Sequence, residues 1–406
     1  MSFFGKNNLI AAGKIQAGKS SQHFFLKELA TNDGGFVRTP CYVCTIQNRH
    51  MTPTQIAAFR LQNQQITHPS FARPQEVAAW LGAMQAQDYT HAKWAVGLRL
   101  PGSTDADIEA AIDRGDIVRT HVLRPTWHFA AAEDIRWMLA LSAPQIRTSV
   151  TAMNKQLGLD EALFKKTNAF IAKTLEGGDQ LTREEIMAEL AKTGITANNL
   201  QATHIMFQAE LDAIVCNGSR RGKQFTYVLL DERVPPGKML ARPDAIAELA
   251  RRYFTSHAPA TLADFQWWSG LRAADARAGL EAMQPYLVKE IVENQTYWIP
   301  NDFKPKKTEP LNLHLLPAFD EFLVSYKDRS ASLAPSRKVQ TITGNGIFKP
   351  VVAVNGWVKG IWQRTFKKDS IVVEKEMFEE LNAAEHEAFE EAVERFKAFV
   401  KVPSLE

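Results

Sequence analysis

The ten residues Arg119-Thr120-His121-Val122-Leu123-Arg124-Pro125-Thr126-Trp127-His128 decide how this chain should fold, because they predict a tight hairpin. We expect strands over 117–121 and 127–131, joined by a turn at Leu123-Arg124-Pro125. Positions 119 and 121 then share one strand face, as do positions 126 and 128. Paired arginine and histidine side chains suit contact with phosphate. The alternative is a hydrogen-bonded turn with surface arginines; a metal pair is disfavoured because no third ligand has suitable spacing.

Earlier in the chain, Met84-Gln85-Ala86-Gln87-Asp88-Tyr89 places two neutral amides two residues apart, where an apolar helix ends. On a continuous helix, residues i and i+2 do not face each other. In an extended corner they lie on the same side, and Asp88 is a candidate N-cap for the next helix. Amides donate and accept hydrogen bonds without titrating, so they can orient a water molecule or recognise a base edge. The simpler interpretation is that both glutamines cap helix ends.

The composition is that of a globular protein with a sizeable core, since 45% of the 406 residues are hydrophobic. No apolar run of about eighteen residues occurs, so we expect no membrane span. The net charge is only +3, and its basic excess lies in residues 1–50, so any case for nucleic-acid binding must rest on local patches. Cys41, Cys44 and Cys216 are too few for a disulfide framework, which favours a reducing cytoplasmic setting. Cys41 and Cys44 form a lone C-x-x-C without a second ligand pair.

Residues 1–50 mix Lys, Ser, Gly and Asn with short apolar pieces and show no sustained periodicity. We expect a poorly ordered N-terminal extension, with Met51 as the natural start of the protein. The alternative is a basic arm that becomes ordered on nucleic acid.

From Met51 onward, one kind of unit recurs three times: short helices followed by two strands that a polar turn joins. This is the sequence form of a winged helix. The expected fold is therefore α+β, with tandem winged-helix units over 51–158, 159–242 and 243–306. A small β-rich C-terminal domain over 307–406 follows and ends in a helix.

Apolar periodicity and caps such as Thr104, Thr182 and Thr261 predict most helix positions. Helices are expected over 74–84, 90–98, 105–113, 183–192, 198–214, 272–283 and 382–400. Further strands are expected over 225–229, 311–316, 346–354, 357–365 and 370–374, with a hairpin over 286–299.

Outside the first unit, three groups of residues suggest chemistry. The basic turn 217–223 offers Arg220, Arg221 and Lys223 to phosphate. The adjacent carboxylates Asp320 and Glu321 suit a general base or a water-positioning pair, or they pin the basic loop at Arg329. A basic run that includes Arg364 is either a solvated face or, with Trp357 and Trp362, a nucleic-acid groove.

Four separated segments resemble the AlkZ-like winged-helix DNA glycosylases. They are 81–88, 119–128 with 132–134, 316–322, and 346–350 with 354–356, and the match covers nearly everything after Met51 in the same order. The resemblance implies tandem winged helices plus a β-rich C-terminal domain around a basic channel, with no metal and no cofactor. The family's Gln-x-Gln hallmark falls on Gln85 and Gln87, whereas a sister branch has Asp at the second position.

The resemblance implies a monofunctional DNA glycosylase that hydrolyses the N-glycosidic bond of N-alkylated purines in double-stranded DNA. Some members unhook interstrand crosslinks. A cytoplasmic, bacterial nucleoid-associated monomer is expected, with Gln85 and Gln87 catalytic. The expected DNA-binding residues are Arg119, His121, Arg124, Thr126, His128, Arg220, Arg221, Lys223, Arg329 and Arg364, supported by Asp320 and Glu321.

The alternative is a non-catalytic winged-helix DNA-binding protein or regulator. A nuclease or deaminase would need metal ligands that the sequence lacks. ATP-dependent, dinucleotide-dependent and serine-hydrolase functions are excluded because their motifs do not occur.

Overall fold

The computed structural model describes residues 29–30, 36–37, 51–307, 309–367 and 370–400. The chain divides into two units, Met1–Arg49 and His50–Glu406. In the first unit, β1 (Leu29–Ala30) pairs with β2 (Phe36–Val37) in antiparallel fashion. The rest of the expected N-terminal extension lies outside the described residues, as do Cys41 and Cys44.

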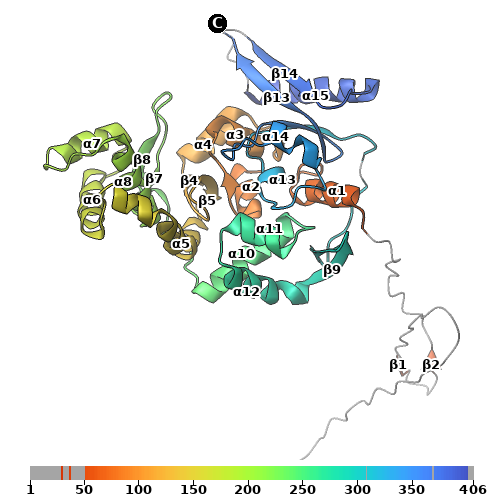
Figure 1. Ribbon diagram of the computed structural model, residues 1–406, viewed down its shortest axis with the longest axis horizontal. Coiled ribbons are helices and arrows are strands. Elements are labelled where there is room, and N and C mark those ends of the chain that lie inside the picture. Colours follow the sequence, from red (N-terminus) through yellow and green to blue (C-terminus); the bar gives the residue numbers. More distant parts are fainter. Residues whose placement is uncertain (1–28, 31–35, 38–50, 308, 368–369, 401–406) are drawn as a thin grey trace, which may run out of the picture. The chain divides into compact units, whose positions relative to one another are not determined.

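The second unit begins with four helices around a small sheet (Figure 1). The helices are α1 (Pro53–Asn63), α2 (Pro74–Leu81), α3 (Tyr89–Leu98) and α4 (Asp105–Asp113), and the sheet has the order β3 (Met84–Gln85), β5 (Trp127–Ala131), β4 (Ile117–His121). The two strands predicted from the hairpin are confirmed. The first predicted helix ends at Leu81 rather than at residue 84, because Gly82 adopts a positive φ of 78° and the chain then enters β3.

The next segment repeats helices and a small sheet. It contains α5 (Ile135–Gln156), α6 (Glu161–Thr174), α7 (Arg183–Ala191), α8 (Asn199–Leu211) and α9 (Leu230–Arg233), and the sheet order β6 (Leu181–Thr182), β8 (Thr226–Leu229), β7 (Val215–Asn217). The capping box predicted at Thr182 is confirmed by reciprocal hydrogen bonds with Glu185. The helix predicted over 198–214 ends at Leu211, where Ala213 takes a positive φ and β7 follows.

The third segment packs three helices beside a hairpin. It contains α10 (Arg242–Ser256), α11 (Leu262–Ser269), α12 (Ala273–Met283), the 3-10 turn η1 (Gln284–Tyr286), β9 (Leu287–Val292) and β10 (Gln295–Pro300). The predicted hairpin is confirmed, and both turn residues, Glu293 and Asn294, have positive φ angles. The cap predicted at Thr261 is confirmed as well.

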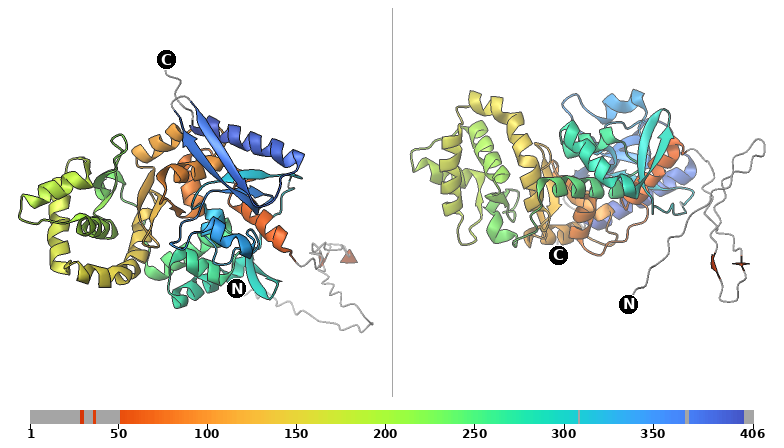
Figure 2. Two further views of the ribbon diagram at one scale, coloured as in Figure 1. Left: turned by 45° about the horizontal axis from the view of Figure 1, so that its top comes forward. Right: turned by 90° about the horizontal axis from the view of Figure 1, so that it is seen from below.

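The last segment carries a four-stranded antiparallel sheet and a terminal helix (Figure 2). The strands, in spatial order, are β11 (Leu313–Leu316), β12 (Val351–Val354), β13 (Trp357–Phe366) and β14 (Ile371–Met377). The helical pieces are α13 (Glu321–Val324), η2 (Pro335–Arg337), α14 (Lys338–Thr341) and α15 (Ala383–Val400). The architecture is a mixture of helices and small sheets, so the predicted α+β class is confirmed.

Helix α3 joins the first segment to the C-terminal sheet. Trp94 packs against Phe396 and Phe399 of α15, and its indole nitrogen donates a 2.8 Å hydrogen bond to the carbonyl oxygen of Leu315 in β11. A Cβ at Gly97 would overlap the Phe399 ring, so this glycine permits the close approach. None of the helices in the described residues is both long enough and apolar enough to span a membrane.

A fully buried ion pair lies at the end of α3. The Arg99 guanidinium donates to both carboxylate oxygens of Asp320, at 2.8 Å and 2.9 Å, and also to Gln64 and to the Ala95 carbonyl oxygen. Asp320 additionally accepts from the backbone nitrogen of Phe322 as the N-cap of α13. Because every charged oxygen has a donor, the pair holds α3 and α13 together without leaving a buried charge unmatched.

Asp320→Ala should lower the free energy of unfolding of the protein by about 3–5 kcal/mol, since Arg99 would stay buried without its counter-ion. Glu189→Gln is the control, because Glu189 forms an exposed pair with Lys192 and should contribute less than about 1 kcal/mol. Urea unfolding of both variants measures the difference. A loss at Asp320 no larger than that at Glu189 would show that the pair does not hold these elements together.

Candidate functional site

The Gln85–Gln87 corner runs beside β5. Gln85 pairs with His128 in the β3–β5 register, and the backbone nitrogen of Ala86 donates a 2.7 Å hydrogen bond to the carbonyl oxygen of Trp127. Asp88 then caps α3 by accepting from the backbone nitrogen of His91. The extended corner and the cap that the sequence predicted are therefore both present.

The hairpin fixes the orientation of both amides. Oε1 of Gln85 accepts a 3.0 Å hydrogen bond from Nη2 of Arg124, and Oε1 of Gln87 accepts a 3.4 Å hydrogen bond from the backbone nitrogen of Trp127. Guanidinium and backbone N–H groups only donate, so the amide oxygens must face them. Gln85 is buried, whereas Gln87 is exposed. Neither Nε2 has a hydrogen-bond partner among the described residues, so both amides keep donors for a ligand or water.

The carboxylate of Glu321 lies directly behind the corner. Its Oε1 accepts a 2.7 Å hydrogen bond from the backbone nitrogen of Gln85, and its Oε2 accepts from the Trp268 indole and the Ser325 hydroxyl. Burial alone would raise the pKa of Glu321, but the nearby His257 ring, and after it the Ser325 hydroxyl and the backbone N–H of Gln85, hold it at about 2. A negative charge is thus fixed next to Gln85 at neutral pH.

The turn of the hairpin places Arg124 opposite that charge. Leu123 has a φ of 62°, and a Cβ at Gly270 would come within 2.6 Å of the Leu123 carbonyl oxygen, so the turn is packed tightly against the end of α11. Burial lowers the pKa of Arg124, while the Glu321 charge opposes that shift. Nε of Arg124 and Oγ1 of Thr126 are buried without a hydrogen-bond partner in the described residues. Polar groups left unpaired in this way suit ordered water.

Burial places His128 inside the protein rather than at a DNA-facing surface. Its Nδ1–H donates a 2.8 Å hydrogen bond to the carbonyl oxygen of Thr126, and its Nε2 is buried without a partner in the described residues. Burial, and secondarily the nearby Arg124 charge, lowers the pKa of His128 to about 3. The ring is therefore neutral near pH 7 and offers an acceptor, not a cation for phosphate.

Arg119 is also buried, at 4% exposure, and its guanidinium is committed to the protein. It donates to the carbonyl oxygen of Ala86 and, at 2.7 Å, to Oδ1 of Asn217, and it lies between the rings of Trp127 and Phe225. This contact ties the corner to the strand before the basic turn. An exposed phosphate ligand was expected here, but strand alternation does not reveal that a second segment covers this face.

His121 is linked to a buried acid that the sequence analysis missed. Its Nδ1 lies 2.7 Å from Oε2 of Glu210 in α8, and the same oxygen accepts from the His121 backbone nitrogen and the Thr120 hydroxyl. The His121 ring packs on Trp127 and Phe207 and is only partly exposed. Glu210 falls within an ordinary helix pattern, so no local signal distinguished it from a surface residue.

Among the predicted DNA-binding residues, those of the basic turn are the most exposed. Arg221 and Lys223 are exposed, and Arg221 forms an ion pair with Glu185. Arg220 is half-buried, with its guanidinium over the Tyr89 ring at 5.0 Å from the centroid. Because Tyr89 follows Asp88, this contact brings the turn next to the corner.

Arg329 and Arg364 come from the C-terminal segment. Arg329 donates to the carbonyl oxygens of Leu323 and Lys327. It forms no ion pair with Asp320 or Glu321, because these carboxylates bind other donors. Burial lowers the pKa of Arg329 to about 10. Arg364 of β13 contacts His91 of α3.

The described residues contain no group of three or more His, Cys, Asp or Glu side chains that could hold a metal ion. Burial raises the pKa of the Cys216 thiol to about 12, so this cysteine is not a nucleophile. The polar groups gathered at the corner are two oriented amides, a buried carboxylate and an arginine.

Comparisons with known proteins identify the family of the chain. The family model described as "DNA glycosylase AlkZ-like" matches residues 78–399. An "Interstrand DNA cross-link repair glycosylase" of Streptomyces sahachiroi is 22% identical over 324 residues, which cover 76% of this chain and 87% of that protein. The solved structure "Streptomyces sahachiroi DNA glycosylase AlkZ" superposes with a TM-score of 0.73 at 21% identity, covering 86% of this chain and 96% of that one.

Glu321→Gln should lower the thermal midpoint of unfolding by a few degrees at pH 7, and this difference should shrink as the pH falls from 4.5 to 3. The pKa of Glu321 is lowered on folding, so its stabilising effect is complete above the ordinary value of 4.5 and is lost as the pH falls towards 2. Thermal melts of both proteins between pH 7 and pH 3 test this. Glu281→Gln, at an exposed position, reports the general effect of removing one acid. A difference that stays constant with pH would mean that Glu321 is not charged.

Proposed function

Because the chain belongs to the AlkZ-like family of DNA glycosylases, we propose that it hydrolyses the N-glycosidic bond of N-alkylated purines in double-stranded DNA. Gln85 and Gln87 would position the attacking water. The observation that carries this proposal is the fixed orientation of both amides, whose oxygens face donors from the hairpin while their Nε2 groups stay unpaired in the described residues.

The proposed hydrolysis can be carried out by uncharged side chains. A purine alkylated at N7 or N3 is already cationic, so it leaves without strong protonation by the enzyme. Its departure develops positive charge at the anomeric carbon of the sugar. An oriented amide can hold a water on the open face of that carbon, and each oxygen keeps a second lone pair for this contact. Preorganised dipoles of this kind contribute a factor of about 10²–10³ in rate.

Glu321 would supply the charge that the amides lack. Its carboxylate is ionised at neutral pH and hydrogen bonds to the backbone of Gln85, so it favours positive charge at the corner. Arg124 offsets part of this field while orienting Gln85. Amides and carboxylates cannot form a Schiff base with an abasic sugar, which supports a monofunctional hydrolase rather than a lyase.

DNA would contact the protein through winged-helix units. We interpret residues 51–158, 159–242 and 243–306 as three such units, because each places helices before an antiparallel hairpin, with 307–406 as the closing domain. The exposed Arg221 and Lys223, with Arg220, His121, Arg124, Arg329 and Arg364, are the proposed contacts.

A crosslinked base cannot rotate fully out of the duplex, unlike an ordinary flipped base. The exposed position of Gln87 is compatible with such a substrate, and the relative from Streptomyces sahachiroi is named a cross-link repair glycosylase. Crosslink unhooking, a monomeric state and a cytoplasmic, nucleoid-associated location remain parts of the proposal.

Replacing Gln85 and Gln87 together by Ala should abolish release of 7-methylguanine from alkylated duplex DNA, with duplex affinity unchanged within about twofold. The single variants should each lose about 10²–10³ in rate, because either amide alone positions the water poorly. Chromatography of released bases under single-turnover conditions measures the rates. Gln156→Ala, at an exposed glutamine at the end of α5, is the matched control.

If the double variant releases the base as fast as the parent, the amides are not catalytic. If the parent binds duplex DNA but releases no base from any alkylated duplex, the protein is a non-catalytic winged-helix binder.

The double variant Arg221→Met, Lys223→Met should weaken binding to damaged and undamaged duplexes by the same factor. Each lost phosphate contact reduces the slope of log affinity against log salt by about 0.9, so a total reduction of between about 1 and 2 is expected. Fluorescence anisotropy at several salt concentrations measures it. Lys165→Met with Lys166→Met removes two exposed charges from α6 as a control. Equal slopes for both double variants would exclude the basic turn from DNA binding.

A further inference from the structure

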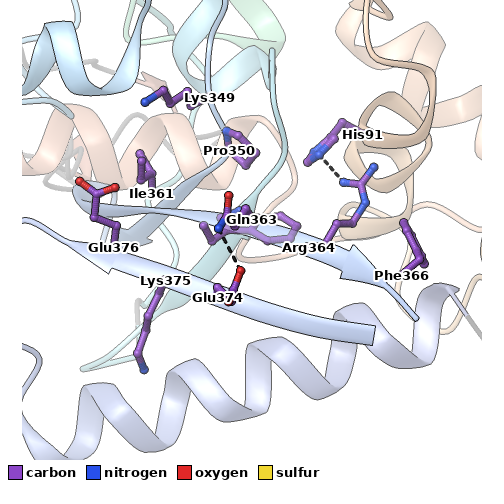
Figure 3. Close-up of a pocket in the computed structure, with 11 residues that line it drawn as sticks. His91, Lys349, Pro350, Ile361, Gln363, Arg364, Phe366, Glu374, Lys375 and Glu376 are labelled. Carbon is purple, nitrogen blue, oxygen red and sulfur yellow. Dashed lines mark hydrogen bonds between the residues drawn. The ribbon is translucent and has the colours of Figure 1, made fainter. Parts of the chain in front are cut away.

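A pocket lies between α3 and the C-terminal sheet, outside the glutamine corner. Its volume is about 580 Å³, and its lining includes His91, Lys349, Trp362, Arg364 and Phe366 (Figure 3). Figure 3 shows His91 and Arg364 pointing towards one another at one end, with Glu376 at the other. Acidic side chains also line the pocket, and Lys349 is drawn on the same side as Glu376 (Figure 3).

The proton on His91 can be assigned from its neighbour. The backbone nitrogen of Ala318 donates a 3.0 Å hydrogen bond to Nδ1 of His91. A backbone amide cannot accept, so Nδ1 carries no proton and the hydrogen of the neutral ring is on Nε2. Burial, and secondarily the Arg364 charge, lowers the pKa of His91 to about 4, which agrees with a neutral ring. His91 therefore presents an N–H donor to the pocket, and the ring is 7% exposed.

The N–H donor of His91 faces a second donor, the guanidinium of Arg364. Nε2 of His91 faces Nη1 of Arg364, and a guanidinium has no acceptor. Among the described residues Arg364 forms no ion pair, although Asp88 and Asp105 lie near enough to oppose the effect of burial on its pKa. Its planar group lies near the rings of Phe366 and Phe396, at 5.5 Å and 5.9 Å from their centroids. Two converging N–H groups without an acceptor between them suit a ligand with several acceptor oxygens.

Resting on the proposed function, we infer that His91 and Arg364 form a subsite for one phosphodiester of the DNA backbone. A phosphate oxygen accepts from Nε2 of His91 while the guanidinium moves to bind the same phosphate. Lys349 adds a further cation to the pocket lining. Free phosphate offers the same chemistry, but the position of the pocket favours DNA.

The position follows from the chain itself. His91 comes four residues after Gln87, so their Cα atoms lie within about 14 Å of each other. DNA rises 3.4 Å per nucleotide along each strand, so this distance corresponds to roughly four nucleotide steps. A damaged nucleotide at Gln87 therefore brings neighbouring phosphates within reach of the subsite. A phosphate held at the subsite would then set which nucleotide of the strand lies at the glutamine corner.

Arg364→Met tests the cation, with Lys397→Met as the matched control, because Lys397 pairs with Glu394 on the outer surface of α15. In fluorescence anisotropy with an undamaged duplex, Arg364→Met should reduce the salt slope by about 0.9 and Lys397→Met should leave it unchanged. Between 50 and 200 mM salt, the parent should then lose about 3.5-fold more affinity than Arg364→Met. Unchanged slopes in both variants would overturn the subsite.

His91 has its own pair of variants. In His91→Asn the side-chain oxygen can replace Nδ1 as the acceptor for Ala318 while the pocket donor is lost, and in His91→Gln the amide nitrogen can replace Nε2 as the donor. His91→Asn should weaken duplex binding about tenfold with an unchanged salt slope, and His91→Gln should restore most of the affinity. Equal affinities for both variants would leave His91 with a structural role only.

Binding of inorganic phosphate distinguishes free phosphate from the DNA backbone as the ligand of the pocket. If millimolar phosphate raises the thermal midpoint of the parent but not of Arg364→Met, while duplex binding is the same for both, the site binds free phosphate and the DNA assignment fails. Base release is measured independently. A protein that releases no base but shows the predicted salt slopes would retain the phosphate subsite and lose the glycosylase proposal.

Discussion

The buried pair of adjacent carboxylates Asp320 and Glu321 is the constraint on which the candidate site depends. Asp320 holds Arg99 at the far end of α3, and Glu321 holds the backbone of Gln85 just before that helix. One dipeptide therefore fixes both ends of the segment that carries the two glutamines. Buried charges stabilise a fold only when every oxygen is matched, and here each carboxylate accepts at least three hydrogen bonds.

The fixed position of the two glutamines explains how neutral side chains would act at the proposed reaction centre. An amide that rotates freely offers water no fixed acceptor, so any gain depends on orientation before the substrate arrives. Orientation comes from the backbone of Trp127 and from Arg124, which lies beyond a turn with a positive φ at Leu123. Because α13 belongs to the C-terminal segment, the first segment alone would lack the carboxylate that holds the corner.

Local sequence patterns predicted many of the helices and strands, but they did not predict which side chains the fold buries. The strands over 117–121 and 127–131 and the caps at Asp88 and Thr104 depend on neighbouring residues, so the sequence contains their signals. Burial of Arg119 and His128 depends on segments far away in the chain. Asn217 lies 98 residues from the arginine that it binds, and strand alternation is unchanged whether a face meets water or another segment. Helices α1, α5, α6 and α10 were not predicted, and the apolar residues of α5 and α10 share one buried core.

The charges near the corner limit how a protein of this kind would select damage. The net charge of only +3 adds little attraction for DNA beyond the proposed local contacts. In the proposed reaction, discrimination would arise where the glycosidic bond breaks. A cationic alkylated base would be attracted to the fixed negative charge of Glu321, whereas an undamaged purine is neutral and would gain nothing from it. Arg124 carries the opposite charge and would offset part of that attraction while its guanidinium orients Gln85. Under the proposed function, selectivity for weakened glycosidic bonds would follow from this electrostatic attraction, without a pocket shaped to one base.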